Sequence, residues 1–394
     1  MPTQQRKVAL VADPARSFVR GICEGVAIAA QSMPGWSVEL VDPEAIPEAD
    51  AEGRYDGFIA RILSERTARA LERTGKIVVD VYGREWGFGF SRAVCDHSAI
   101  GRMAADHFLG RRYRNFAFCG SEGAYFSDMR RESFAACVSE AGFKCLVYGA
   151  RKSSRRQRAS STALGGRAGS EAEREALREW IRSLPRPVAV FCCNDTRAAQ
   201  VVKLCRESLI SVPDDIAVLG VDNDILCCGF TSPTISSIDA NAHEIGRTAV
   251  SLLEAGFAGA EPKTVPVRPK DIVPRASSET FPVDPPWLSK ALVHMRRNVS
   301  RGLSASDVFS FLGLSHTVVE GAFRRILGTT VQKEIVKSRM EEACRLLDTT
   351  DLPVTEISRL SGFSSPEYFC RTFTAQNSIS PNQWRMKTRS QPQA

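Results

Sequence analysis

Carboxylate and amide side chains recur at one kind of place in the first 275 residues of the chain, directly after short apolar runs that predict β-strands. They are Asp13, Asp96, Asn194–Asp195 and Asp222–Asn223. In open α/β sheets, ligands bind outside the carboxyl ends of the strands. Carboxylate and amide oxygens accept paired hydrogen bonds from vicinal hydroxyl groups, as sugars present them. Each residue taken alone is more simply a helix N-cap, but four such places favour a polar cleft.

The elements that would position these side chains alternate regularly between strand and helix. Strands are predicted at Val8–Ala12, Val38–Val41, Gly57–Ile62, Ile77–Val81, Phe116–Cys119, Cys145–Tyr148, Val188–Cys193 and Ala217–Val221. Helices are predicted at Phe18–Gln31, Ile100–Leu109, Ser127–Glu140, Glu171–Ser183, Thr196–Ser208 and Ala242–Glu254. Repeated β-α alternation predicts parallel sheets with helices on both faces. Over this length we expect two doubly wound lobes.

A second constellation, near the C-terminus, suits a nucleic acid. Val354, Ile357 and Leu360 recur at helical spacing, so one face of that helix is apolar. Gly362 allows a sharp turn, because glycine adopts positive φ without steric penalty. Ser364 or Ser365 can cap the next helix, with Pro366 in its first turn. The pattern predicts a helix-turn-helix, although a short helical hairpin without function would look the same.

The same pattern occurs a second time upstream. An apolar helix runs from Ser304 to Gly313, and a second helix from Ser315 ends at Gly328. Between the two copies, residues 331–347 form an amphipathic helix with its apolar residues mostly on one side. We therefore expect an all-α domain with two helix-turn-helix units joined by a rigid helix. Residues 287–394 hold 15 Lys and Arg against 9 Asp and Glu, so they carry +6 of the chain's net +7. Such an excess favours binding to phosphates.

These helices resemble the AraC/XylS-type DNA-binding domain over residues 287–386. The resemblance rests on Gly313, Ser315…Phe323-Arg324, Arg339…Ala343-Leu346-Leu347, Ile357…Gly362-Phe363, Tyr368-Phe369…Phe373 and Ser380-Pro381…Trp384-Arg385. It implies that the second helix of each unit enters a major groove on one face of double-stranded DNA. The DNA-binding candidates are His316, Thr317, Glu320, Arg324, Arg325, Ser365, Glu367, Tyr368 and Arg371. Gly321 departs from the family, which often has a basic residue there, so the first recognition helix is expected to contribute less specificity.

The first 275 residues resemble the LacI/GalR and periplasmic-binding-protein type of sugar sensor. The matching segments are Val94-Cys-Asp96…Gly101–Leu109, Arg114–Gly120, Arg130–Phe134, Phe191–Ala198, Val212–Asn223 and Ser232–Ile238. The resemblance implies an effector cleft lined by Asp13, Phe18, Asp96, Arg130, Asn194, Asp195, Asp222 and Asn223. In LacI/GalR relatives the DNA-binding domain usually lies at the N-terminus, whereas here it follows the sensor. The chain resembles regulators that combine the two domains in this order. That resemblance implies a homodimer, a pentose effector such as D-xylose, and transcriptional activation.

The expected organisation is an effector domain at 6–275, a Pro-containing linker at 276–286, the DNA-binding domain at 287–386 and a tail at 387–394. The basic, Ser/Gly-rich stretch 151–169 lacks periodicity. We predict a surface loop there, and the alternative is an extra contact to DNA phosphates. The twelve cysteines show no metal spacing and fit a reducing cytoplasm. No apolar run is long enough to span a membrane.

The predicted function is therefore an effector-responsive transcription factor that needs neither cofactor nor metal, with RNA polymerase as a possible partner. One alternative is a DNA-binding protein whose α/β domain senses another small molecule or only forms dimers. A more remote one is a doubly wound enzyme. The sequence argues against an enzyme, because it has no Gly-x-Gly-x-x-Gly after the first strand, no phosphate loop and no Gly-x-Ser-x-Gly elbow.

Overall fold

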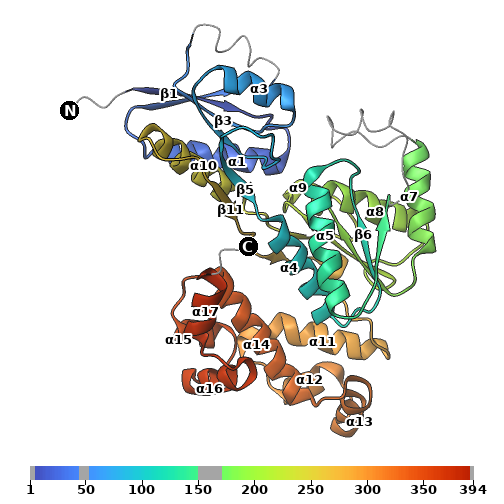
Figure 1. The fold of residues 1–394 in the computed structure, drawn as a ribbon. Coiled ribbons are helices and arrows are strands. Elements are labelled where there is room, and N and C mark those ends of the chain that lie inside the picture. Colours follow the sequence, from blue (N-terminus) through green and yellow to red (C-terminus); the bar gives the residue numbers. More distant parts are fainter. Residues whose placement is uncertain (1–4, 44–52, 150–170, 391–394) are drawn as a thin grey trace. The chain divides into compact units, whose positions relative to one another are not determined.

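The computed structural model describes residues 5–43, 53–149 and 171–390 (Figure 1). Its contacts divide the chain into two compact units, Met1–Ser278 and Glu279–Ala394, which we call the sensor unit and the helical unit. The basic stretch predicted as a loop at 151–169 lies outside the described residues. Within the described residues no helix is both long and apolar enough to cross a bilayer.

The sensor unit contains two six-stranded sheets, one in each lobe. The first has the order β11-β5-β4-β3-β1-β2 and is parallel throughout. Its strands are β1 (Arg6–Val11), β2 (Trp36–Val41), β3 (Gly57–Ala60), β4 (Ile77–Asp80), β5 (Ser91–Cys95) and β11 (Thr264–Val267). The second has the order β12-β10-β9-β8-β6-β7, with only the β10–β12 pair antiparallel. Its strands are β6 (Phe116–Cys119), β7 (Cys145–Tyr148), β8 (Val188–Cys192), β9 (Ile216–Val221), β10 (Ser236–Ile238) and β12 (Ile272–Val273).

Central strands of both sheets are buried on both faces, as their sequences require. Every residue of β8 and β9 is buried, and both strands are rich in valine and other apolar residues. Such strands need helices on either side of the sheet. The predicted two-lobed, doubly wound fold is confirmed. The short strands β10, β11 and β12 were not predicted, because polar Ser236–Ser237 and Pro266 interrupt the apolar pattern.

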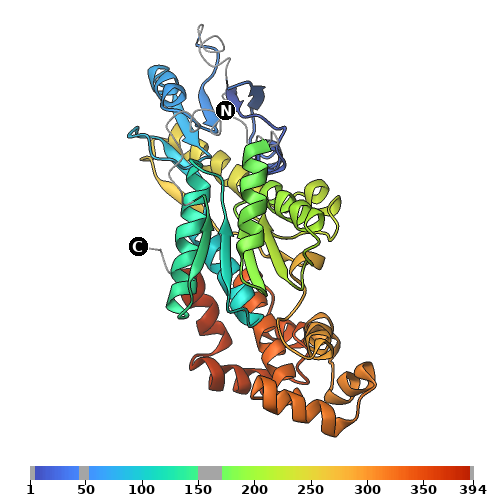
Figure 2. The ribbon, with the colours of Figure 1, turned by 90° about the vertical axis from the view of Figure 1, so that its right-hand side faces the viewer.

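Helices cover both faces of each sheet (Figures 1 and 2). In the first lobe α1 (Ser17–Ala30) and α10 (Ala242–Phe257) lie on one face and α3 (Glu65–Arg73) on the other. In the second lobe α4 (His97–Gly110) and α5 (Tyr125–Glu140) lie opposite α7 (Glu171–Ser183) and α8 (Asp195–Glu207). A short helix, α9 (Ile225–Gly229), follows β9.

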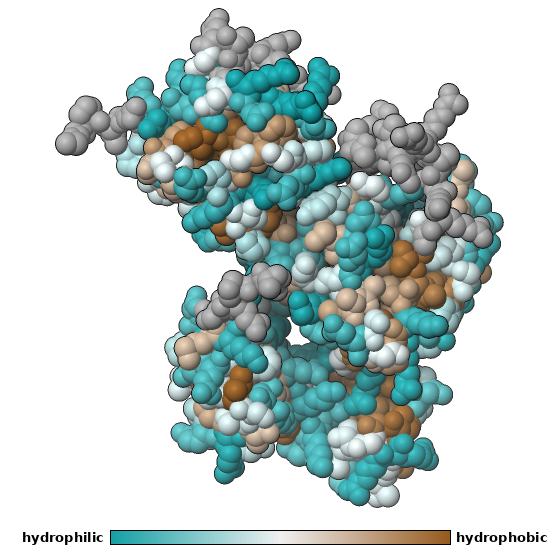
Figure 3. Space-filling view, in the orientation of Figure 1, coloured by the Kyte–Doolittle hydropathy of each residue, from teal (hydrophilic) through white to brown (hydrophobic). Residues whose placement is uncertain are grey.

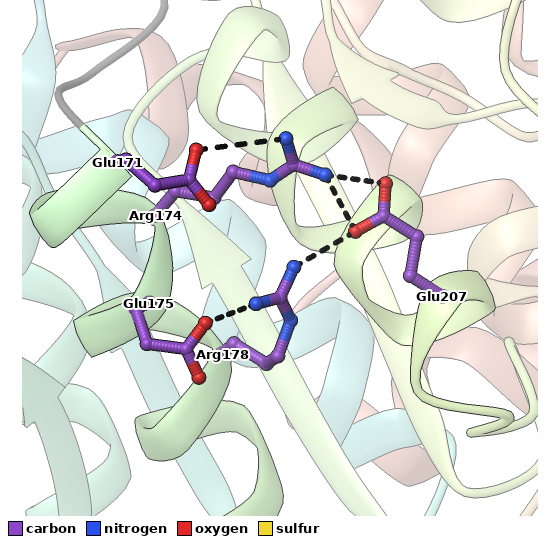
Figure 4. A network of polar contacts seen from close by, with 5 residues as sticks. All are labelled: Glu171, Arg174, Glu175, Arg178 and Glu207. Atoms are coloured by element: carbon purple, nitrogen blue, oxygen red, sulfur yellow. Dashed lines mark hydrogen bonds and ion pairs between the residues drawn. The ribbon is translucent and has the colours of Figure 1, made fainter.

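An ion-pair network joins α7 to α8 (Figure 4). Arg174 and Arg178, one turn apart on α7, both reach Glu207 of α8, at 2.7 and 3.1 Å. Each arginine also pairs with a carboxylate of its own helix, Glu171 or Glu175. The shared carboxylate of Glu207 therefore fixes how the two helices align.

The helical unit contains two small hydrophobic cores that share one long helix. The first core lies among α11 (Pro286–Asn298), α12 (Ala305–Leu312), α13 (His316–Ala322) and the start of α14 (Val331–Thr349). The second lies among the end of α14, α15 (Val354–Leu360), α16 (Pro366–Asn377) and α17 (Pro381–Ser390). The π-helical turn η3 (Phe323–Leu327) extends α13. The predicted helical domain with two helix-turn-helix units is confirmed.

A close backbone contact also connects the two halves of the helical unit. Gly362, in the turn between α15 and α16, has φ +77°, and a Cβ there would lie 2.0 Å from the carbonyl oxygen of Val299. Val299 begins the short helix η2 (Val299–Arg301), which follows α11 in the first half. Only glycine fits this position, so the second helix-turn-helix packs directly on the first half.

Candidate effector site and nucleic-acid interface

Polar and aromatic side chains from both lobes of the sensor unit meet at the carboxyl ends of the two sheets. Tyr82, after β4, and Tyr125, at the start of α5, have ring centroids 6.3 Å apart. Arg61, after β3, lies near enough to Asp222, after β9, to interact electrostatically with it. We call the set Arg16, Arg61, Tyr82, His97, Tyr125, Arg130 and Asp222 the interlobe cluster. It lies where ligands bind to open parallel sheets.

Asp222 and Arg130 form the charged centre of this cluster. A guanidinium nitrogen of Arg130 lies 3.7 Å from the Asp222 carboxylate, and the Arg130 side chain is only 3 % exposed. Arg130 also donates a hydrogen bond to the carbonyl oxygen of Cys193, and its guanidinium lies 5.2 Å from the ring centroid of Phe126. Burial raises the pKa of Asp222 to about 6, although Arg130 and Arg61 oppose the shift. The pair thus presents donors and acceptors together, as recognition of hydroxyl groups requires.

Two further arginines approach from the first lobe. The Arg61 guanidinium lies 5.2 Å from the centroid of the Tyr82 ring. Arg16, in the loop between β1 and α1, lies close enough to act on Arg61, and burial together with this like charge lowers the Arg61 pKa. Arg16 also acts on Asp222. The cluster therefore has arginines from both lobes.

His97 completes the cluster from the second lobe. Its ring centroid lies 6.1 Å from that of Tyr125. Burial and the charge of Arg130 hold its pKa well below the usual value, so the imidazole is neutral at pH 7. Its Nδ1 atom is buried and has no hydrogen-bond partner within the described parts of the chain. A ligand hydroxyl group would satisfy this atom.

Residues behind Asp222 hold its loop in place. Asp222 and Asn223 both have positive φ, +104° and +50°. The carboxyl of Asp195 accepts hydrogen bonds from the Ser237 hydroxyl, at 2.6 Å, and from the Asp224 backbone N–H, at 2.8 Å. Burial, followed by the charge of Asp222, raises the Asp195 pKa to about 8. Asp195 thus supports the loop as a largely protonated acid.

The other predicted effector residues have local structural contacts. Asp96 and Asn194 cap α4 and α8, accepting backbone N–H groups at 2.8 and 2.9 Å. Asp13 accepts the Ala15 N–H at 3.0 Å, and Phe18 packs partly buried against the core of the sensor unit. The Asn223 side chain accepts a hydrogen bond from Arg275. Of the eight predicted residues, the structure brings Arg130 and Asp222 into direct contact with each other.

Sequence reasoning did not single out Arg16, Arg61, Tyr82 or Tyr125 as site residues. Arg61 nevertheless follows β3 directly and Tyr82 lies two residues after β4, close to the kind of position that drew attention to Asp222. Arginine and tyrosine at the carboxyl ends of strands give the same signal as the acidic and amide side chains there, and it points to Arg61 and Tyr82.

The first recognition helix in the helical unit is α13. His316 and Thr317 are exposed in its first turn, and the His316 ring lies 4.7 Å from that of Phe309. Glu320 is mostly covered and lies 3.8 Å from Arg324, whereas Arg324 and Arg325 are exposed. Gly321 is exposed, and a Cβ there would meet no atom within 4 Å. Packing therefore does not require glycine at this position.

The second recognition helix, α16, presents a charged outer face. Ser365 caps it, accepting the Tyr368 N–H at 3.2 Å. Tyr368 packs on Phe363, while Arg371 lies above the Tyr368 ring, 5.8 Å from its centroid. Glu367, Arg371 and Thr374 are exposed together and Phe369 and Phe373 are buried. Most of the surface of the helical unit on the side seen in Figure 3 is hydrophilic. An exposed polar helix of this kind can enter a major groove.

Comparisons with known proteins match parts of both units to the two types of domain predicted from the sequence. Residues 105–278 match the periplasmic binding protein-like domain, and residues 310–387 match a helix-turn-helix domain. The chain is 24 % identical over 400 residues to the xylose operon regulatory protein of Haemophilus influenzae, with 98 % of this chain and 100 % of the relative covered. The Escherichia coli K12 protein of the same name is 24 % identical over 396 residues, with 98 % of each covered. The chain is a DNA-binding transcriptional regulator.

A solved structure of a xylose-binding transcription activator has the same fold as this regulator. It superposes with a TM-score of 0.62 at 24 % identity, covering 98 % of the regulator and 99 % of that chain. The resemblance of the regulator to xylose operon regulatory proteins thus extends over both units. The described residues contain no group of His, Cys, Asp and Glu side chains that could hold a metal ion.

Proposed function

We propose that the regulator is a sugar-responsive transcriptional activator whose effector, a pentose such as D-xylose, binds at the interlobe cluster. The observation that carries this proposal is the contact between Arg130 of α5 and Asp222, a buried guanidinium 3.7 Å from a carboxylate that follows the carboxyl end of β9. The names of the relatives, which are xylose operon regulatory proteins, support a pentose.

A sugar bound there would contact both lobes. Asp222 would accept from one hydroxyl and Arg130 would donate to its neighbour, while Arg61 and Tyr82 would approach from the first lobe. Contacts to both lobes stabilise a closed state of the sensor unit. The effect on DNA binding can be no larger than the difference in affinity of the sugar for the two states.

The active species in this proposal is a homodimer in the cytoplasm, bound to double-stranded operator DNA and contacting RNA polymerase. Exposed apolar side chains on and after α9 supply a surface for the dimer: Ile225 is 75 %, Leu226 60 % and Phe230 86 % exposed. All twelve cysteines are free thiols, which agrees with a reducing compartment. Sedimentation of the wild type and a Phe230→Glu variant tests the dimer. A wild type that sediments as a monomer would contradict it.

Thermal unfolding in the presence of single sugars tests the effector. Binding to the folded state raises the melting temperature, corresponding to about 2.7 kcal/mol at a hundredfold excess over Kd. We expect a shift with a pentose that Asp222→Asn abolishes. A shift with a different small molecule would replace the pentose and keep the mechanism. No shift with any compound, in protein that still binds DNA, would favour a sensor unit that only forms dimers.

A further inference from the structure

The interlobe cluster contains more positive charge than a neutral sugar needs. Arg130 lies 3.7 Å from the carboxylate of Asp222, and Arg16 and Arg61 lie near enough to lower its pKa together with Arg130. Arg130 is matched by Asp222 and by the Cys193 carbonyl oxygen. Within the described residues, neither Arg16 nor Arg61 has a side-chain hydrogen bond or ion pair. Two guanidinium groups are therefore left over.

The other carboxylates near the cluster are occupied by their own loops. Asp80 accepts the backbone N–H groups of Ile62, Tyr82 and Gly83, at 2.9 to 3.2 Å. Asp224 accepts those of Leu226 and Cys227, both at 3.0 Å, and so caps α9. Asp13 is exposed and accepts the N–H of Ala15. These acidic groups stabilise turns, and within the described residues none of them forms a hydrogen bond or ion pair with Arg16 or Arg61, although the charge of Asp13 acts on Arg61.

Holding the like charges of Arg61 and Arg16 near each other, partly buried, also costs free energy. Both are partly buried, and burial followed by the charge of Arg16 lowers the Arg61 pKa. The Tyr82 ring holds the Arg61 guanidinium by a face contact at 5.2 Å, which leaves its N–H donors free. A planar guanidinium with free donors suits an oxyanion, because two N–H groups can reach two oxygens at once.

The start of α1 adds to the same positive field. Arg16 is the N-cap residue of this 14-residue helix; no side chain caps it and no acidic residue lies in its first turn. The first N–H groups of a helix lack intrahelical partners and carry partial positive charge. An oxyanion near Arg16 would therefore meet the helix N-terminus and two guanidinium groups.

We propose that the interlobe cluster binds an anionic derivative of the sugar more tightly than the neutral sugar, with the oxyanion on Arg16 and Arg61 and the hydroxyl groups on Arg130 and Asp222. This inference rests on the proposed function, since it needs a sugar at the interlobe cluster. The oxyanion can be a carboxylate, as in an aldonic or uronic acid, or a phosphate ester. Discrimination against the neutral parent sugar comes from the two arginines that the neutral sugar leaves unpaired.

Calorimetric titration of the full-length protein tests the proposal with D-xylose, D-xylonate, D-glucuronate and D-xylulose 5-phosphate as probes. We expect one anionic probe to bind at least about tenfold tighter than D-xylose, with a preference that weakens as salt is added. Tighter binding of xylonate or glucuronate would assign a carboxylate, and tighter binding of the phosphate ester would assign a phosphate.

Single substitutions test which arginines bind the anionic probe. Arg61→Gln and Arg16→Gln should each weaken binding of the anionic probe by about tenfold or more, and by more than they weaken binding of D-xylose. Arg20→Gln is the matched control: Arg20 is exposed on α1 one turn beyond Arg16, so it should leave both affinities unchanged. If Arg61→Gln fails to fold, Arg61→Lys keeps the charge, removes the bidentate geometry and should still weaken binding of the anion.

Three outcomes would overturn the inference in different ways. If D-xylose binds as tightly as every anionic probe, the effector is neutral, and the sugar-sensing function stands without an oxyanion site. If no probe binds to protein that retains DNA binding, the sugar-sensing function itself fails. Loss of anion affinity in Arg20→Gln equal to that in Arg61→Gln would also contradict a specific site.

Discussion

Arg275 donates a hydrogen bond of 2.7 Å to the side-chain oxygen of Asn223, the residue that follows Asp222 of the interlobe cluster. The same guanidinium donates to the carbonyl oxygen of Ile235, and the Arg275 backbone N–H donates to the Ser236 hydroxyl. Three residues later, at Ser278, the sensor unit ends. A side chain next to the interlobe cluster is thus bonded to the segment through which the chain leaves this unit.

Replacing Arg275 should reduce the effect of the effector on DNA affinity more than it reduces the affinity for the effector itself. Arg275→Ala removes the bonds to Asn223 and Ile235 without touching Arg130 or Asp222. Coupling energies of about 1 to 3 kcal/mol are typical of effectors, so the ratio of DNA affinities with and without effector should approach one. Titration of labelled operator DNA measures this ratio, and calorimetry measures effector affinity. Arg247→Ala, on the exposed side of α10, is the control; a full response in Arg275→Ala would contradict the coupling.

Stability of the sensor unit should fall as pH rises from 6 to 8, because of Asp195. Its folded-state pKa of about 8 lies above the ordinary carboxyl value, so unfolding releases a proton in this window. Stability present at acid pH is therefore lost as pH rises through the folded pKa, by up to about 1.4 kcal/mol per pH unit. Asp222, whose pKa is about 6, contributes less to the dependence of stability on pH above pH 6.

Asp195→Asn should remove this pH dependence. The amide oxygen can accept the Asp224 N–H, and the amide N–H can donate to the Ser237 hydroxyl oxygen, so both neighbours stay hydrogen-bonded to a neutral side chain although the bond to Ser237 is reversed. Urea unfolding of the full chain at pH 6, 7 and 8 measures the slope. Equal slopes for the wild type and Asp195→Asn would show that Asp195 is ionised in the folded protein.

Specific DNA binding should depend on Arg371 of the second recognition helix. Arg371 is exposed beside Glu367 on the outer face of α16, and a lost base contact costs about 1 to 3 kcal/mol. Arg371→Ala should therefore weaken operator binding by more than it weakens binding to unrelated DNA. Arg297→Ala is the matched control, since Arg297 lies on α11 and pairs with Glu279. Equal loss in the two variants would remove Arg371 from the interface.

The first recognition helix should become more stable with alanine at Gly321. A Cβ at this position meets no neighbour, and alanine favours the helix by about 1 kcal/mol over glycine. Gly321→Ala should slow hydrogen exchange in α13 about fivefold. Gly328→Ala is the opposite control, because Gly328 has φ +66° at the end of η3 and alanine would be strained there. Faster exchange in Gly321→Ala would contradict the account.

The architecture of both units could be read from the sequence because it depends on local patterns. Buried strands such as β8 and β9 are continuous apolar runs, and the capping residues Ser304 and Ser365 precede periodic helices. Those signals survive in the fold because propensity and burial agree. By contrast, β11 joins the first sheet although β10, before it in the chain, belongs to the second. No local pattern encodes such a crossover.

The site was less predictable, because an acidic or amide residue at a strand end can either cap the next helix or face a binding site. Asp96 and Asn194 cap helices, as Asp and Asn do anywhere. Asp222 follows a strand in the same way and faces Arg130 instead. Only the three-dimensional arrangement separates these roles. The charge excess of Arg16 and Arg61 has the same origin, since the two residues lie far apart in sequence and meet through neighbouring strands β1 and β3.

The contact of Gly362 with Val299 should set the spacing of the two half-sites that the helical unit can bind in its operator. The turn of one helix-turn-helix packs against the backbone of the other half, and α14 contributes to both cores, so we expect α13 and α16 to keep a fixed spacing. The distance between base-pair groups they contact is therefore a fixed property of the protein, and successive major grooves lie about 10.5 base pairs apart. An operator whose half-sites are moved apart by a single base pair must bend or untwist to be bound, so the DNA bears the whole mismatch.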